Sequence, residues 1–290
     1  MEIAEIQPQL VQEFSKILSS KKLSHAYLFS GGFGNFELAI WLSQAIFCET
    51  PGVLPCLKCR ACRLIAKGEY ADLHLISPDG MMIKTAQIKA LTEVFSESGY
   101  ESNRKVIIIQ EADKMHPNAA NALFKSIEEP ERDSYLFLLT QNENLILPTI
   151  LSRTQVIKFP KQTPYFKSVL EQNGILPTQA ELLCQLTDSI DDAIKMAQTS
   201  WFSEGLNKCF QFVKLMKSDP DDAFLYLSAL TETFDDKARQ QVLFDLLIQL
   251  FYQEKWTKKI EKTFEATTMW QHNVRFESCL NYIVLESEKD

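Results

Sequence analysis

The sequence contains no long apolar run, no low-complexity stretch and no internal repeat. A helix that spans a bilayer needs about 20 consecutive apolar residues, so we expect no membrane partner. The first residues, Met1 to Ile6, do not show the basic segment and apolar core of a secretory signal. These absences together predict a cytoplasmic protein.

Basic residues are also in short supply. The chain has 30 Lys and Arg against 38 Asp and Glu, which gives a formal net charge of -8. Such an acidic chain is poorly suited to gripping a phosphate backbone over a broad surface. Basic residues do recur in Lys255–Lys262, where we interpret them as the solvated face of a helix. Any contact with nucleic acid should therefore be local or shared with partners.

Up to Pro160 the chain alternates apolar strands with helical patterns. This alternation predicts an α/β domain with a parallel sheet and flanking helices. Helices are predicted at Leu38–Phe47, Thr85–Ser98 and Asn118–Glu128. The predicted strands are Ala26–Ser30, Leu73–Ile76, Val106–Gln110, Tyr135–Thr140 and Val156–Phe159.

Beyond Pro164 only helical periodicity remains. A length of 290 residues allows two or three domains. We predict the α/β domain at residues 1–160, a small all-α lid at 161–199 and a further all-α domain at 200–290. The clearest helix of the last segment is Arg239–Trp256, whose apolar residues extend beyond one face. Such a helix either lies inside a bundle or also packs against other subunits, and the pattern leaves both open.

A glycine-rich turn follows the first predicted strand, with glycines at Gly31, Gly32 and Gly34. This is where a P-loop nucleotide-binding protein places its phosphate cradle. In such a cradle backbone N–H groups face the phosphates, a Lys reaches the β and γ oxygens, and a Ser or Thr hydroxyl holds magnesium. The simpler alternative is an ordinary turn between a strand and a helix.

The side chains that a P-loop needs are missing in either alignment. If Gly31 is the first glycine of the motif, Glu37-Leu38 stands at the Lys and Ser/Thr positions. If Gly34 is the last, Asn35-Phe36 stands there. We therefore predict a degenerate nucleotide site and expect no bound ATP.

The second half of the nucleotide site is degenerate as well. An active P-loop ATPase has an apolar strand followed by Asp-Glu, where the Asp holds magnesium and the Glu polarises the attacking water. Here the apolar strand from Val106 leads to Gln110 and Glu111. A neutral amide is a poor ligand for a hard dication, which prefers carboxylate oxygen. Of the Asp-Glu pair, only the glutamate is present in this chain.

Four of the seven cysteines form a cluster with the spacing C-x7-C-x2-C-x2-C, at Cys48, Cys56, Cys59 and Cys62. Two short C-x2-C steps let thiolates converge on one tetrahedral ion, and the fourth closes the site, as structural zinc requires. Disulfides are disfavoured in a reducing cytosol. The alternative is a set of unrelated buried thiols. The other cysteines, Cys184, Cys209 and Cys279, lie in apolar helical settings and are predicted to fill the core.

Five segments occur in the order seen in bacterial sliding-clamp loaders. The chain resembles this family of AAA+ proteins, and within it the delta-prime branch. The matching motifs span residues 23–154, and the carboxy-terminal third is similar only in being helical. The segments are His25–Phe29, the four-cysteine insertion, Ile109–Lys114, Asn118–Pro130 and Leu151–Thr154.

The resemblance implies an AAA+ domain, a helical lid and a helical collar through which five subunits form an open ring. The implied partners are ATPase subunits of the gamma or tau type and a delta-type subunit, with the sliding clamp and primed DNA reached through the complex. It also implies that delta-prime members do not hydrolyse ATP, which agrees with the missing Lys, Ser/Thr and Asp.

Arg153 is the residue for which the resemblance implies a positive role. It stands in Ser152-Arg153-Thr154, which matches the family's Ser-Arg-Cys motif except for Thr154. In the family this arginine reaches into the ATP site of the adjacent subunit, and such fingers increase turnover by roughly a thousandfold or more. Without the surrounding motifs, an ordinary surface arginine would be the preferred interpretation.

Two further positions are altered relative to active members of the family. A lid arginine that contacts the γ-phosphate is expected near Ser189–Ala193, which holds Asp191 and Asp192 and no Arg. A carboxylate there would repel a phosphate. Thr140–Asn142 stands where relatives place a γ-phosphate sensor, and we interpret it as a turn only.

The sequence therefore predicts a non-hydrolysing clamp-loader subunit with a structural zinc ion. One alternative is an active ATPase motor subunit of the same loader, or a subunit that binds nucleotide without turnover through backbone amides alone. A second is a zinc-dependent DNA-binding protein, for which the cysteines are the support and the net acidity the objection.

Overall fold

The computed structural model describes residues 2–96, 102–128 and 133–285. The chain forms two compact units, residues 1–162 (unit 1) and 163–290 (unit 2). The division falls close to the predicted end of the α/β domain at Pro160. The helices predicted for the lid belong to unit 2, and the separation of a lid at 161–199 from a domain at 200–290 stays a prediction.

Unit 1 contains a five-stranded parallel sheet in the order β2-β3-β4-β1-β5. Its central strands are continuous apolar runs because both faces are covered, as is usual in parallel sheets. In β3, every residue is buried. The strands are β1 (Ala26–Ser30), β2 (Leu73–Ile76), β3 (Lys105–Ile109), β4 (Ser134–Thr140) and β5 (Gln155–Lys158). All five predicted strands are confirmed; β3 and β5 are shifted by one residue, and β4 begins one residue earlier than predicted.

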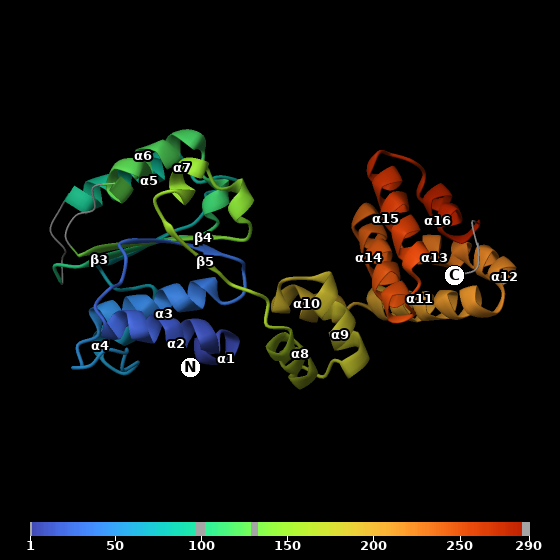
Figure 1. Ribbon diagram of the computed structural model, residues 1–290, viewed down its shortest axis with the longest axis horizontal. Coiled ribbons are helices and arrows are strands. Elements are labelled where there is room, and N and C mark those ends of the chain that lie inside the picture. Colours follow the sequence, from blue (N-terminus) through green and yellow to red (C-terminus); the bar gives the residue numbers. More distant parts are fainter. Residues whose placement is uncertain (1, 97–101, 129–132, 286–290) are drawn as a thin grey trace. The chain divides into compact units, whose positions relative to one another are not determined.

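Helices cover both faces of this sheet (Figure 1). On one face lie α1 (Glu2–Ile6), α2 (Pro8–Ser19), α3 (Asn35–Phe47) and α4 (Arg60–Lys67). On the other lie α5 (Thr85–Ser96), α6 (Pro117–Glu128) and α7 (Pro148–Leu151). Short 3₁₀ turns follow β3 and β4, namely η1 (Ala112–Lys114) and η2 (Glu143–Leu145).

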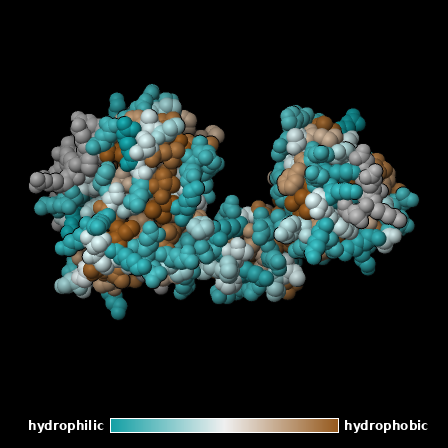
Figure 2. Space-filling view, viewed as in Figure 1, coloured by the Kyte–Doolittle hydropathy of each residue, from teal (hydrophilic) through white to brown (hydrophobic). Residues whose placement is uncertain are grey.

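Alternating side chains of the strands form two hydrophobic layers, because successive strand residues point to opposite faces. Phe14 of α2 packs edge-on against Tyr27 and Phe29, and both of these rings contact Phe137. On the other face Leu28 belongs to a core that also includes side chains of β3, β4, α5 and α6. In Figure 2 hydrophilic residues cover most of the visible surface of unit 1, interrupted by a band of hydrophobic residues.

Among its described residues, unit 2 consists of helices joined by turns and loops and contains no strand. It comprises α8 (Thr163–Gln172), α9 (Pro177–Leu186), α10 (Ile190–Ala197), α11 (Ser200–Ser218), α12 (Pro220–Leu225), α13 (Leu227–Thr233), α14 (Lys237–Gln253), α15 (Thr257–Gln271) and α16 (Phe276–Leu285). Cys184, Cys209 and Cys279 are buried here, as predicted.

The helix predicted at Arg239–Trp256 ends earlier, at Gln253. Lys255 adopts a left-handed conformation with φ 63°, which stops the helix. Trp256 then folds back, and its ring lies 5.6 Å from that of Phe251. The apolar pattern continues to Trp256, which packs on the helix without belonging to it. The predicted carboxy-terminal end of this helix was therefore wrong.

The last positions of the predicted helix Thr85–Ser98 lie outside the described residues, and so does the Glu129-Pro130 end of the family motif that begins at Asn118. Within the described ranges, no helix combines the length and apolar composition needed to cross a membrane.

Candidate functional site

The glycine-rich turn joins β1 to α3 in unit 1. The N–H of Gly31 donates to the Thr140 carbonyl at 2.9 Å, and the N–H of Gly34 donates to the Gly32 carbonyl at 3.2 Å. Gly31 and Gly34 have φ values of 107° and 88°, which favour glycine. The predicted turn is therefore present, with Gly34 as the residue that precedes the first turn of α3.

The chain's own side chains pack closely around this turn. The Gln7 amide donates to the Phe33 carbonyl at 2.9 Å and to the Pro160 carbonyl at 2.8 Å. A β-carbon at Gly34 would lie 3.0 Å from Ile6 Cγ2. On the other side, the amide of Gln141 lies so close that a β-carbon at Gly32 would be 2.4 Å from its Oε1.

The structure brings together the two predicted halves of the nucleotide site. A pocket of about 260 Å³ lies at the carboxyl ends of β3 and β4 and the start of α3. Among the described residues its lining contains no Lys or Arg, so an anion there would meet backbone N–H groups, neutral side chains and the carboxylate of Glu111. Six of the residues that line it are Asn35, Phe36, Gln110, Glu111, Thr140 and Gln141.

Glu111, the carboxylate that survives in the site, is paired locally. It has a left-handed backbone with φ 48°, and its carboxylate forms an ion pair with Lys114 of η1. This contact raises the pKa of Lys114. The next carboxylate, Asp113, accepts a 2.6 Å hydrogen bond from the hydroxyl of Thr140. Both acids are thus bound within the chain.

Thr140–Asn142 forms the turn that the sequence indicated. The Asn142 N–H donates to the Thr140 hydroxyl at 3.1 Å, and the Asn142 side chain accepts from the N–H of Asn144 at the start of η2. The contact between Gln141 and the glycine-rich turn was not predicted. No spacing signal in the sequence links residues 32 and 141, which the parallel pairing of β1 with β4 brings together.

Arg153 lies in the turn between α7 and β5 and does not line the nucleotide pocket. Its Nε donates to Glu128 Oε1 at 2.6 Å, and its guanidinium lies 5.8 Å from the centre of the Phe124 ring. Its Nη1 donates to the Thr149 carbonyl and to the Ser152 hydroxyl, each at 3.2 Å. The side chain is 39% exposed. The role of Arg153 stays a prediction, and no sequence pattern pointed to its carboxylate partner.

In unit 2, Asp191 and Asp192 occupy the first turn of α10. The Ser189 hydroxyl caps this helix by accepting from the Asp192 N–H at 3.2 Å. Acids in the first turn of a helix are favoured by its dipole, which accounts for both residues without a ligand.

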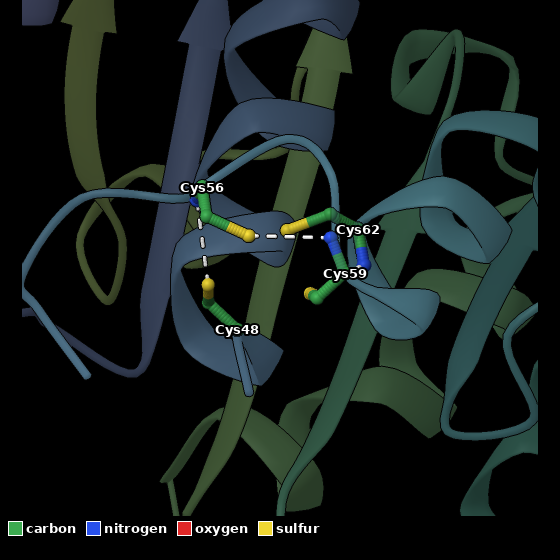
Figure 3. A group of neighbouring side chains, drawn as sticks. All are labelled: Cys48, Cys56, Cys59 and Cys62. Atoms are coloured by element: carbon green, nitrogen blue, oxygen red, sulfur yellow. Dashed lines mark hydrogen bonds between the residues drawn. The ribbon is translucent and has the colours of Figure 1, made fainter. Parts of the chain in front are cut away.

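The four clustered cysteines converge at the end of α3 and the start of α4, with their sulfurs pointing toward one another (Figure 3). All four Sγ atoms lie within 4.8 Å of one another. The N–H of Cys56 donates to Cys48 Sγ and the N–H of Cys59 to Cys56 Sγ, each at 3.3 Å. Cys59 Sγ in turn caps α4 by accepting from the Cys62 N–H.

This donor set suits a thiophilic dication. The side chain of Thr50 and then backbone N–H groups lower the pKa of Cys56 to about 6. Burial acts in the opposite direction and raises the pKa of Cys62. A bound dication would offset the cost of burying the Cys62 thiolate. A tetrahedral ion with bonds of about 2.3 Å needs sulfurs about 3.8 Å apart, and the four sulfurs lie within 4.8 Å of one another.

The sheet order β2-β3-β4-β1-β5, the helices on both faces and the glycine-rich turn after β1 define a protein of the AAA+ class. The family described as "DNA polymerase III, delta subunit" matches residues 6–163. The chain is 35% identical to the DNA polymerase III subunit delta' of Bacillus subtilis over 254 residues, which cover 86% of this chain and 77% of that protein. It therefore belongs to the delta' family of DNA polymerase III subunits.

Other relatives match over a shorter length. The delta' subunit of Escherichia coli is 29% identical over 51% of this chain and 47% of its own length. The tau subunit of Bacillus subtilis is 33% identical over 54% of this chain and 28% of its own length. A gamma subunit-related protein of Thermotoga maritima has a similar solved structure, with a TM-score of 0.47, 18% identity and coverage of 95% of this chain and 97% of that chain.

Proposed function

We propose that this chain is a non-hydrolysing subunit of a bacterial clamp loader and contributes Arg153 to the ATP site of a neighbouring subunit. Its partners would be ATPase subunits of the gamma or tau type and a delta-type subunit in a pentamer. Through that complex it would act on the sliding clamp and primed DNA in the cytoplasm. The names of its delta' relatives and its similarity to a tau subunit support this assignment.

The observation that carries the proposal is that the chain's own nucleotide pocket and the candidate arginine lie at different places. The chain's own nucleotide pocket has no cation in its lining, and Gln141 covers the Gly32 backbone on one side. Arg153 stands outside that pocket and is partly exposed. A guanidinium stays charged and can grip phosphate oxygens, which suits it to act on a nucleotide that another subunit binds.

The cysteine cluster has a structural role in this proposal. Cys48, Cys56, Cys59 and Cys62 would hold one zinc ion and fill its coordination sphere, leaving no position for a reactive water. When bound, the ion would fix the start of α4 against the end of α3. Residues 161–199, nearly all of them in unit 2, would serve as the lid, and residues 200–290 as part of the collar.

The test is DNA-stimulated ATP hydrolysis by a loader reconstituted with this chain or its Arg153→Ala form. We expect the chain alone to be inactive and the substitution to lower turnover by roughly a thousandfold at the site that Arg153 serves, without preventing assembly. An exposed arginine of α4, Arg63→Ala, is the matched control. Normal turnover in an assembled Arg153→Ala complex would reduce the subunit's role to ring architecture.

A further inference from the structure

The guanidinium of Arg153 is held by groups from two separate elements. Glu128 comes from the last turn of α6, whereas Thr149 and Ser152 come from α7 and the turn after it. From this geometry we propose that Glu128 is a positioning residue, which orients Arg153 for its action on a neighbouring ATP site. The inference rests on the proposed function of Arg153.

These contacts use only some of the N–H donors of the Arg153 guanidinium. A guanidinium has five N–H donors in one rigid plane. Nε donates to Glu128 at 2.6 Å, and Nη1 donates to the Thr149 carbonyl and the Ser152 hydroxyl. Among the described residues Nη2 has no hydrogen-bond partner. Because the group is planar, fixing Nε and Nη1 also fixes the direction in which the two N–H bonds of Nη2 point.

The same contacts argue against the opposite role, in which Glu128 would restrain Arg153 in an inactive state. A restraining carboxylate would occupy the outer donors that a phosphate needs. Glu128 instead binds Nε, the donor nearest the chain, and the ring of Phe124 lies 5.8 Å from the guanidinium carbon. Both contacts limit the rotamers of a long side chain while leaving Nη2 available. Preorganisation of this kind favours charge stabilisation in a transition state.

The experiment is a double-mutant cycle in the reconstituted loader, with DNA-stimulated turnover measured across ATP concentrations. Glu128→Ala should lower kcat by roughly tenfold with little change in KM, because misplaced groups lose rate more than affinity. Glu128→Gln keeps an oxygen that can accept from Nε and should retain most of the rate. Asp79→Ala removes the surface ion pair with Lys84 in the same unit and should have no effect.

The decisive comparison is Glu128→Ala in the Arg153→Ala background. If Glu128 acts through the arginine, it should cause no further loss there, since coupled residues are not additive. An equal loss in both backgrounds, or a faster rate in Glu128→Ala alone, would overturn the inference. The outcomes also separate the two proposals. No effect of Arg153→Ala refutes the finger, whereas an effect of Arg153→Ala with none from Glu128→Ala refutes only the positioning role. Thermal unfolding and assembly of each variant are measured in parallel. If Ala fails to fold, Glu128→Asp replaces it, because the shorter side chain withdraws the carboxylate from Nε and should again lower kcat.

Discussion

The side-chain amide of Gln141 lies directly against the backbone of Gly32, where a β-carbon would come within 2.4 Å of Oε1 and 2.6 Å of Nε2. In an active P-loop the glycines leave room for a phosphate to approach the backbone. Here the side chain of Gln141, at the end of β4, occupies that space. A glycine at position 32 is therefore required by the chain's own packing.

A direct consequence concerns nucleotide binding. The isolated chain should show no saturable binding of ATP or ADP in a calorimetric titration, because its pocket offers no cation to the phosphates. Gln141→Ala opens space beside Gly32 and should still not bind, since the missing charge is not restored. A tau-type subunit is the positive control. Tight binding by the unaltered chain would contradict the prediction, and binding by Gln141→Ala alone would show that the side chain was the barrier.

A second prediction separates two reasons why a position requires glycine, namely a positive φ value and a lack of space for a β-carbon. Gly31 and Gly80 both have positive φ values, 107° and 74°, but a β-carbon at Gly31 would lie 2.4 Å from the Phe159 carbonyl oxygen while one at Gly80 meets nothing within 4 Å. Gly80→Ala should cost about 1–2 kcal/mol of the free energy of unfolding of unit 1. Gly31→Ala should cost at least about 1 kcal/mol more because backbone cannot easily give way. Denaturant unfolding checks this, and equal losses would refute it.

Much of unit 1 could be predicted because its local signals agree with its fold. Apolar runs such as Val106–Ile109 read as buried parallel strands, and the C-x2-C steps placed Cys56, Cys59 and Cys62 together. Local spacing cannot show contacts made by tertiary packing. The pairing of Arg153 with Glu128 joins residues 25 apart, and the contact of Gln141 with Gly32 depends on the register of β1 and β4.

The end of α14 shows a different limit. The apolar periodicity from Arg239 continues through Trp256, although the helix ends at Gln253. Helical periodicity records which residues are buried, and Trp256 is packed on Phe251 after the chain has turned at Lys255. Glycine usually occupies the left-handed position that ends a helix, but here that residue is Lys255. The sequence therefore did not mark the boundary.

The metal centre gives a third prediction. Protein purified without chelator should contain one zinc ion per chain by atomic emission, and Cys59→Ser should lose it, since three sulfurs cannot close a structural site. The same substitution should lower the thermal stability of unit 1, because Cys59 also caps α4. Cys279→Ala is the control, as this buried thiol lies in unit 2. Full zinc content in Cys59→Ser, or zinc loss in Cys279→Ala, would contradict the assignment.

The last prediction concerns Asp245, a half-buried carboxylate on α14. Burial raises its pKa above the ordinary value, and the 3.1 Å hydrogen bond from the Gln241 amide offsets this only in part. A carboxylate whose folded-state pKa is raised destabilises the fold at neutral pH, and this cost disappears as the pH falls through the folded and then the unfolded pKa. Asp245→Asn should therefore raise the Tm of unit 2 at pH 7, and its advantage should shrink as the pH is lowered toward 4. Asp221→Asn, at an exposed position on α12, tests for a general effect of removing negative charge from an acidic chain. A gain that is independent of pH, or equal in the two variants, would show that burial of Asp245 is not the cause.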